Sequence, residues 1–217
     1  PLRHFLSATI DFERVRDCHE LQLFIAATNV RTGNGKLFRR EEMDVQRLVA
    51  SACLPTVFAA VEVEGEMYWD GSYVANPPLA PLLAHSAAGD LIIVQNNPIA
   101  RSDMPRTMAD IANRANEIAF NISFVREVSA LQYLNGVPEE IRGAGMMPNT
   151  MRLHLISGSE QLADHGISAK FNAEMAFLQM LHDQGYAAAD GWLKEQGRNV
   201  GVKSTLDIQP VFFADQR

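Results

Sequence analysis

Basic charge and cysteine are both scarce in this chain of 217 residues. Lys and Arg number 19 against 26 Asp and Glu, which gives a formal net charge of −7. Nucleic-acid binding calls for clustered Lys and Arg, so this balance argues against nucleic acid as a partner. The only two cysteines, Cys18 and Cys53, fit no pairing pattern and predict reduced thiols in a reducing, cytoplasmic compartment.

Long apolar runs and metal-binding motifs are also missing from the sequence. No apolar run approaches the roughly 20 residues that span a bilayer, and no basic amphipathic helix is evident, although contact with a membrane surface stays open. The six histidines show no metal-ligand spacing. The glycine-rich stretch 33–36 lacks the length and the Ser or Thr of a phosphate-binding loop. We therefore expect no metal and no cofactor.

Short apolar runs and helical spacings are present throughout the chain and predict an α/β fold. Strands are expected at residues 21–28, 37–39, 57–63, 67–69, 90–95 and 151–156. Helices are expected at 44–52, 77–88, 103–135, 169–183 and 187–196. The succession of strand, helix and strand over 67–95 is typical of a βαβ unit, which implies a parallel sheet covered by helices.

The second half of the chain is expected to be mainly helical. Apolar residues recur three and four positions apart in its long helix, at Met108, Ile111, Ala115, Ile118, Ile122 and Val125. Such a stripe indicates the face packed on the helix's own domain, with a partner or membrane surface as the alternative. No linker or repeat divides the chain, so residues 1–217 are expected to belong to one domain: a sheet in 1–100 and a helical remainder in 101–217.

Asp70 is the one candidate for chemistry. It stands in the run Tyr68-Trp69-Asp70-Gly71-Ser72, where Asp-Gly predicts a sharp turn because Gly accepts φ > 0 and Asp bonds its own backbone. Asn76 and Pro77 then predict a helix start. A nucleophile elbow, Gly-x-Ser-x-Gly, is absent from the sequence. The nearest approaches, in 166–170 and 157–159, lack its closing glycine or its spacing.

The order of blocks around Asp70 carries a family resemblance. The stretch Ala50-Ser51-Ala52-Cys53-Leu54-Pro55-Thr56-Val57-Phe58 comes first, the strand 61–68 follows, and the Asp-Gly turn comes last. This series resembles the second half of the patatin-like phospholipases, which hydrolyse lipid esters with a serine–aspartate dyad. The resemblance runs from about Pro1 to Pro81, and less sharply to the end, where 168–172 and 191–193 are similar to a bacterial branch. Ser72 stands where the family has Gly or Ala.

The resemblance implies a fold, a site and a missing part. The fold would be three-layered, with a mostly parallel central sheet flanked by helices and lacking its N-terminal strands. Asp70 would be the catalytic aspartate, walled by aromatic residues such as Tyr68 and Trp69. The serine would lie on an upstream segment or a second chain that carries the Gly-x-Ser-x-Gly elbow. The substrate would be a lipid or a small ester; its identity and the oligomeric state stay open.

Three functions are therefore weighed for this chain. The first is the aspartate-bearing part of a lipid or carboxylic ester hydrolase, of phospholipase or lipase type. The second is a non-catalytic binding or assembly fragment of a patatin-like domain. The third is a plain α/β domain in which Asp70 is only a turn residue. The intact block around Asp70 favours the hydrolase, because a fragment freed from catalysis has no physical need for that turn.

Overall fold

The computed structural model describes residues 2–55, 57–85, 88–97, 99–101, 103–136, 151–158 and 172–206. It consists of two compact units, Pro1–Leu82 and Leu83–Arg217. Each unit combines helices with a sheet of its own, which confirms the mixed α/β class. That residues 1–217 belong to one domain stays a prediction.

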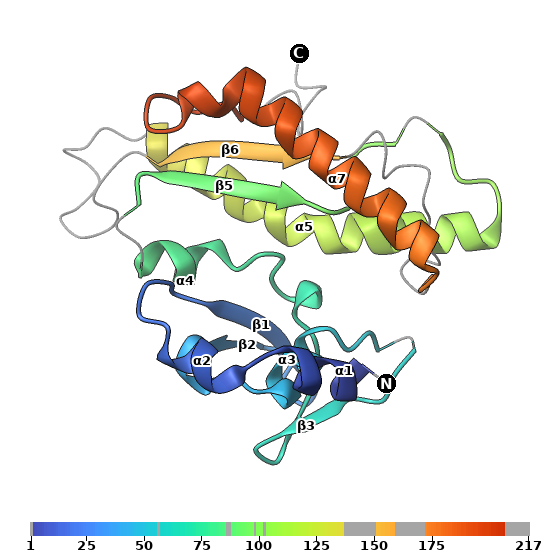
Figure 1. The fold of residues 1–217 in the computed structure, drawn as a ribbon. Helices are drawn as coiled ribbons and strands as arrows, with labels where there is room; N and C mark the ends of the chain where they lie inside the picture. The colour runs from blue at the N-terminus through green and yellow to red at the C-terminus, as the bar shows by residue number, and fades with distance from the viewer. Residues whose placement is uncertain are drawn as a thin grey trace. The chain divides into compact units, whose positions relative to one another are not determined.

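The first unit (dark blue to teal in Figure 1) contains a four-stranded sheet with helices before and between its strands. Its elements are α1 (Leu2–Thr9), α2 (Phe12–Asp17), β1 (Phe24–Asn29), β2 (Gly35–Arg39), α3 (Val45–Ser51), β3 (Val61–Val63) and β4 (Glu66–Asp70), with 3-10 turns η1 (Arg40–Glu42) and η2 (Gly71–Tyr73). The short helix α4 (Leu79–Ala84) begins at the end of this unit. The sequence patterns missed α1 and α2.

The sheet of the first unit is antiparallel throughout, in the order β2-β1-β4-β3. The expected βαβ unit over 67–95 is therefore wrong. Its first strand, β4, already has a hydrogen-bonded neighbour on each side, so no edge of β4 is left for a parallel partner. Parallel pairing occurs in the second unit instead.

Both hairpins of the first unit follow from local turn chemistry. The strands predicted at 21–28 and 37–39 are confirmed and form the hairpin of β1 and β2, with Phe24 opposite Arg39 and Thr28 opposite Gly35. Between β3 and β4, Glu64 and Gly65 have φ values of 53° and 81°. Positive φ at both central residues is the mark of a type I′ turn, whose twist matches that of the flanking strands.

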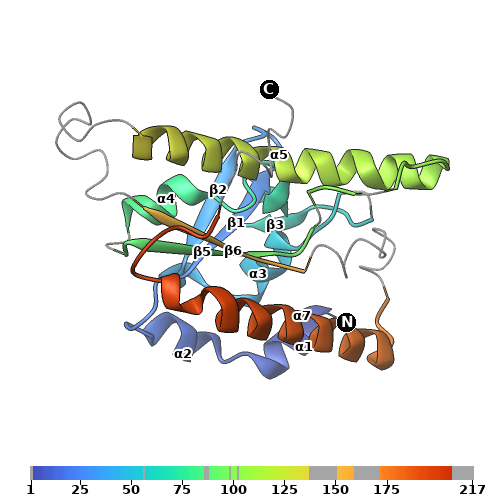
Figure 2. The ribbon, with the colours of Figure 1, turned by 90° about the horizontal axis from the view of Figure 1, so that it is seen from above.

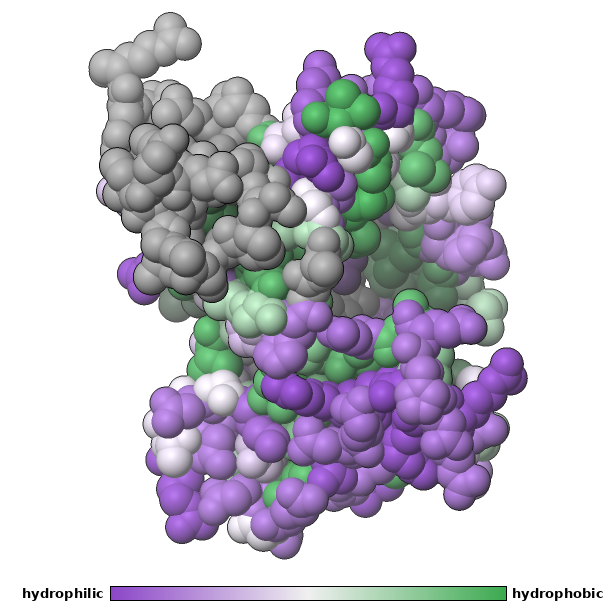
Figure 3. All heavy atoms as spheres, turned by 90° about the vertical axis from the view of Figure 1, so that its left-hand side faces the viewer, coloured by the Kyte–Doolittle hydropathy of each residue, from purple (hydrophilic) through white to green (hydrophobic). Residues whose placement is uncertain are grey.

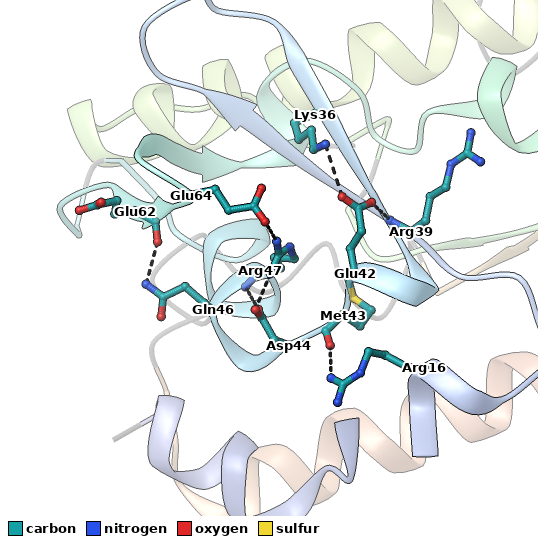
Figure 4. Close-up of polar contacts among 10 residues, drawn as sticks. All are labelled: Arg16, Lys36, Arg39, Glu42, Met43, Asp44, Gln46, Arg47, Glu62 and Glu64. Carbon is teal, nitrogen blue, oxygen red and sulfur yellow. Dashed lines mark hydrogen bonds and ion pairs between the residues drawn. The ribbon is translucent and has the colours of Figure 1, made fainter. Parts of the chain in front are cut away.

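The helix α3 packs on this sheet and completes the core of the first unit. The helix predicted over 44–52 begins at Val45, because Asp44 is its N-cap: Asp44 Oδ1 accepts the backbone N–H of Arg47 at 2.8 Å. Figure 4 shows the Arg47 guanidinium reaching both Asp44 and Glu64, which ties the helix to the β3–β4 turn. The buried core beneath comprises Ala27, Phe38, Met43, Ala50, Val63 and Tyr68.

Two predicted elements near the Asp-Gly turn are shorter than expected. Residues 57 and 58 lie in a turn, because the N–H groups of Val57 and Phe58 both donate to Leu54 C=O, so the strand β3 begins only at Val61. The helix expected to start on Pro77 begins at Leu79 and ends at Ala84. Asp70 therefore leads into the 3-10 turn η2 and not directly into a helix.

The second unit is built around two parallel strands. Its elements are β5 (Asp90–Gln95), α5 (Met108–Gly136), β6 (Arg152–Ser157) and α7 (Met175–Gln196), followed by the 3-10 turn η4 (Gly197–Asn199). Both predicted strands are confirmed, and they pair in register from Asp90 with Arg152 to Gln95 with Ser157. Figures 1 and 2 show α5 and α7 on opposite faces of this pair.

The long helix α5 begins five residues later than predicted. A reciprocal cap sets its start: the Thr107 hydroxyl accepts the Asp110 N–H and the Asp110 carboxylate accepts the Thr107 N–H, each at 3.1 Å. This is a capping box, which satisfies two backbone donors that the helix itself leaves unpaired. The predicted helix start at residue 103 is therefore wrong.

The buried face of α5 is the reverse of the predicted one. Met108 is 80% exposed, and Ile111, Ile118 and Ile122 are exposed as well. The face that is buried comprises Glu117, Phe120, Asn121, Phe124, Val128 and Leu131. The charged residue Glu117 made this face look solvent-exposed in the sequence. Its buried carboxylate is neutralised by Arg101 at 2.6 Å and Arg114 at 3.2 Å, which makes the burial tolerable.

The helix α7 is continuous where a break was predicted at Gln184-Gly185. A single glycine inside a helix costs only about 1 kcal/mol, which the surrounding helix can absorb. The helix starts at Met175, because the preceding turn is held by Asn172, whose Oδ1 accepts the Glu174 N–H at 2.9 Å. The part of the prediction over residues 169–171 lies outside the described residues.

Surface character differs between the two units. The face of the first unit visible in Figure 3 is largely hydrophilic, whereas hydrophobic side chains are visible on the second unit. The exposed apolar residues of the second unit include Ile92 and Val94 of β5 and the outer face of α5. None of the described helices is both long and apolar enough to cross a membrane.

The assignment of the α5 faces can be tested with one substitution on each face. Phe124→Ala should lower the free energy of unfolding by about 3–5 kcal/mol, because the ring is 4% exposed and a cavity would remain. Ile122→Ala, on the exposed face, should cost less than about 1 kcal/mol. Denaturant unfolding followed by Trp192 fluorescence, with Trp69→Phe in the background, measures both. A larger loss for Ile122→Ala would restore the face predicted from the sequence.

Candidate functional site: the Asp70 turn

Asp70 is the last residue of β4, and its side chain caps the 3-10 turn that follows. Oδ1 accepts the backbone N–H of Ser72 at 2.8 Å. Among the described residues, the second carboxylate oxygen, Oδ2, has no hydrogen-bond partner. The side chain is neither fully buried nor fully exposed. One oxygen therefore orients the carboxylate, and the other can exchange a proton with a group placed beside it.

The backbone of Asp70 is held by two residues from other parts of the chain. Its N–H donates to the C=O of Cys53, just after α3, at 2.8 Å. Its C=O accepts the hydroxyl of Thr28, on β1, at 2.7 Å. The peptide groups on either side of Asp70 are thus fixed by hydrogen bonds to two different elements.

Gly71 is required by close packing and not by its backbone angles. Its φ is not positive, unlike that of Gly33, Gly65 and Gly201, so the expected reason for a glycine here is wrong. A Cβ atom added to Gly71 would lie 2.3 Å from the carbonyl oxygen of Ala26 on β1. Any side chain would therefore push the turn away from β1.

The negative charge of Asp70 affects the pKa of two further side chains, Cys53 and Tyr73. Burial raises the pKa of the Cys53 thiol, and the negative charge of Asp70 raises it further. Partial burial raises the pKa of the Tyr73 hydroxyl, and Asp70 adds to that shift as well. Tyr73 is not among the site residues expected from the sequence, although a 3-10 turn places residues three apart on one side. Tyr68, expected beside the carboxylate, packs edge-to-face on Phe38 in the core.

A second set of polar residues meets in the second unit, where none was predicted. Asp90 accepts three hydrogen bonds: from Arg152 Nε at 2.9 Å, from Arg152 Nη2 at 2.7 Å and from the Gly201 N–H at 2.8 Å. His154 Nε2 lies 3.0 Å from Asp90 Oδ1, and His154 Nδ1 lies 2.9 Å from the Thr205 hydroxyl. We assign the proton to Nε2, because a carboxylate can only accept.

The chain Thr205–His154–Asp90 has the connectivity of a catalytic relay but the burial of a structural one. The imidazole of His154 is 0% exposed, and its ring packs against Trp192 of α7 at 5.9 Å between centroids. A substrate could not reach it. Hydrogen bonding to Arg152 holds the pKa of Asp90 well below its usual range, with the Gly201 N–H and His154 lowering it further. This cluster therefore anchors the segment after α7 to β5 and β6.

No other part of the described structure offers a better site. A hollow along α7 is lined by residues of that single helix, from Ala176 to Ala187, and contains none of the Asp70 turn. Across residues 2–206, outside the gaps in the description, no group of three His, Cys, Asp or Glu could hold a metal ion. The nearest elbow-like runs, 166–170 and 157–159, lie wholly or partly outside the described residues. The Asp70 turn is thus the candidate site.

Comparison with known proteins points to the same part of the chain. Residues 1–83 match the family model described as patatin-like phospholipase. The match covers the first compact unit, Pro1–Leu82, including the whole Asp70 turn, and ends within α4. A comparison with curated proteins found no match.

The close approach at Gly71 predicts a large response to the smallest side chain. Gly71→Ala should destabilise the first unit by at least about 1–3 kcal/mol, because the methyl group would meet the backbone of Ala26. Gly185→Ala is the matched control: its Cβ would meet nothing within 4 Å inside α7, so it should stabilise by about 0.5–1 kcal/mol. Denaturant unfolding of both variants tests the pair. Unchanged stability of Gly71→Ala would refute the packing constraint.

The Asp90 cluster predicts a pH dependence of stability. Because the folded state depresses the pKa of Asp90, its contribution is full above the unfolded pKa of about 3.9 and is lost as pH falls below it. Asp90→Asn should therefore be less stable than wild type at pH 7, with a difference that narrows below about pH 4. Asp183→Asn is the control. His182 also lowers the pKa of Asp183, but this pair lies on the exposed surface of α7, where an ion pair contributes little to stability. A constant difference for Asp90→Asn from pH 7 to pH 3 would contradict the linkage.

Proposed function

We propose that this chain supplies the aspartate of a serine–aspartate dyad in a lipid or carboxylic ester hydrolase of phospholipase or lipase type. The observation that carries the proposal is the state of Asp70. Its Oδ1 is committed to the Ser72 N–H, its Oδ2 is uncommitted among the described residues, and the turn lies inside the 1–83 family match. An anchored carboxylate with one open oxygen suits a general base.

The proposed nucleophile is a serine outside the printed sequence, which contains no Gly-x-Ser-x-Gly. We place it on an upstream segment or a second chain that carries the Gly-x-Ser-x-Gly elbow. The serine oxygen bonds to the ester carbonyl carbon while Asp70 Oδ2 takes the serine proton. That proton passes to the departing alcohol when the ester C–O bond breaks. Water, deprotonated by Asp70, then cleaves the acyl-serine, and the proton returns to the serine oxygen.

The remaining features of the turn are compatible with this role. Ser72 keeps a small side chain at the position after Asp-Gly, and its N–H rather than its hydroxyl bonds the carboxylate. Cys18 and Cys53 are both free, which fits the proposed cytoplasmic location. Which ester is hydrolysed depends on the shape of the pocket that the serine-bearing segment would complete.

Asp70→Asn in the complete protein tests the proposal directly. The amide keeps the shape and the bond to Ser72 but cannot take the serine proton, so kcat/KM for a p-nitrophenyl ester should fall about 10²–10⁴-fold. Asp11→Asn is the matched control, because Asp11 also caps a short helix, by accepting the Arg14 N–H at 3.0 Å. It should keep the wild-type rate. If Asp70→Asn hydrolyses the ester as fast as wild type, Asp70 is not the base and the dyad is refuted. If the wild-type protein itself hydrolyses no ester, the binding-fragment alternative replaces the hydrolase.

A further inference from the structure

Among the described residues, the hydroxyl of Thr28 is the one side-chain group that hydrogen-bonds to the backbone of Asp70. Thr28 is 7% exposed and lies on β1, opposite Trp69 in the β1–β4 ladder. From there its Oγ1 donates to the C=O of Asp70 at 2.7 Å, across 42 positions of sequence. The residue is one of few polar side chains buried in the first unit, and this contact satisfies it.

The geometry of Thr28 is fixed by its own strand. β1 is paired on both sides, with β2 and with β4, so its backbone has little freedom to move. Threonine is β-branched, and its χ1 angle is restricted on a strand. The sheet therefore sets the position of the Thr28 hydroxyl, and the hydrogen bond from this hydroxyl fixes the Asp70 carbonyl.

The carbonyl of Asp70 belongs to the peptide group that joins Asp70 to Gly71. Rotation of this peptide group would move Gly71 against Ala26 and would displace the N–H of Ser72, which holds Asp70 Oδ1. The bond from Thr28 thus acts on the carboxylate through the backbone, without touching it. We propose that Thr28 is a positioning residue that sets the direction of Asp70 Oδ2.

This inference rests on the proposed function, in which Oδ2 takes the serine proton. Thr28→Val keeps the shape and volume of the side chain and removes the donor, whereas Thr28→Ser keeps the donor. In the complete protein, Thr28→Val should lower kcat for a p-nitrophenyl ester about 10- to 100-fold with KM nearly unchanged, because misplacement of a catalytic group by about 1 Å has this effect. Thr28→Ser should restore most of the rate.

Thr9→Val provides the matched control. The Thr9 hydroxyl also donates to a carbonyl, that of Phe5, at 2.8 Å, but within α1. Its loss should leave kcat and KM unchanged. If Thr28→Val does not fold, Thr28→Ala, which removes the same donor without crowding, replaces it in the comparison with Thr28→Ser.

Amide hydrogen exchange gives a readout that is independent of activity. In Thr28→Val the Ser72 N–H should exchange faster, because its bond to Asp70 Oδ1 is loosened. The Val30 N–H, which donates to Met67 C=O at 2.8 Å just beyond the β1–β4 ladder, should keep its protection. Equal loss at both amides would indicate general destabilisation and would overturn the positioning role.

The outcomes separate this inference from the function on which it rests. If Asp70→Asn is inactive while Thr28→Val has wild-type kcat, the positioning role fails and the hydrolase stands. If Asp70→Asn is as active as wild type, the proposed dyad fails, and the positioning role fails with it. Loss of kcat in Thr28→Val, recovery in Thr28→Ser and selective exposure of the Ser72 amide together support the inference.

Discussion

The contact between the backbone of Gly71 and that of Ala26 is the constraint on which the candidate site depends. There is no room for a Cβ atom at Gly71, so the chain leaving β4 must lie directly against β1. β1 is itself held between β2 and β4 and cannot move without breaking two ladders. The Asp70 turn therefore packs on a strand that is paired on both sides. This approach also brings the Asp70 carbonyl within reach of Thr28.

Two aspartates of this chain show how hydrogen-bond partners decide what a carboxylate can do. Both carboxylate oxygens of Asp90 accept hydrogen bonds, from Arg152, His154 and the Gly201 N–H. The guanidinium of Arg152 balances the negative charge of Asp90. Such a group stabilises structure and has little capacity left to take a proton. Asp70 has one oxygen bound by Ser72 and one uncommitted among the described residues. The Thr205–His154–Asp90 chain therefore has a structural role, and the Asp70 turn is the better candidate for a catalytic site.

Sequence patterns predicted those helices, strands and turns that depend on interactions between residues close in the sequence. The helix α3, the β1–β2 hairpin and the strand β5 follow from residues that are neighbours in the sequence. The face of α5 could not be predicted in this way, because both of its sides carry apolar residues. The choice depends on Arg101 and Arg114, which allow Glu117 to be buried beside Phe120. Likewise Asp70 could be found from its motif, but Thr28 and the reason for Gly71 depend on contacts between distant segments.

The proposed dyad explains why so many contacts act on the backbone of a single turn. In a serine–histidine–aspartate triad the carboxylate orients an imidazole, and the imidazole moves the proton. In a dyad the carboxylate is itself the base, so its direction must be set without an intermediary. The side chain of aspartate is short, and its direction follows closely from the peptide groups that flank it. Bonds from Thr28 and Cys53 to those peptide groups, together with the Ser72 N–H on Oδ1, supply that control. A carboxylate that only stabilised a turn would need the last of these bonds alone.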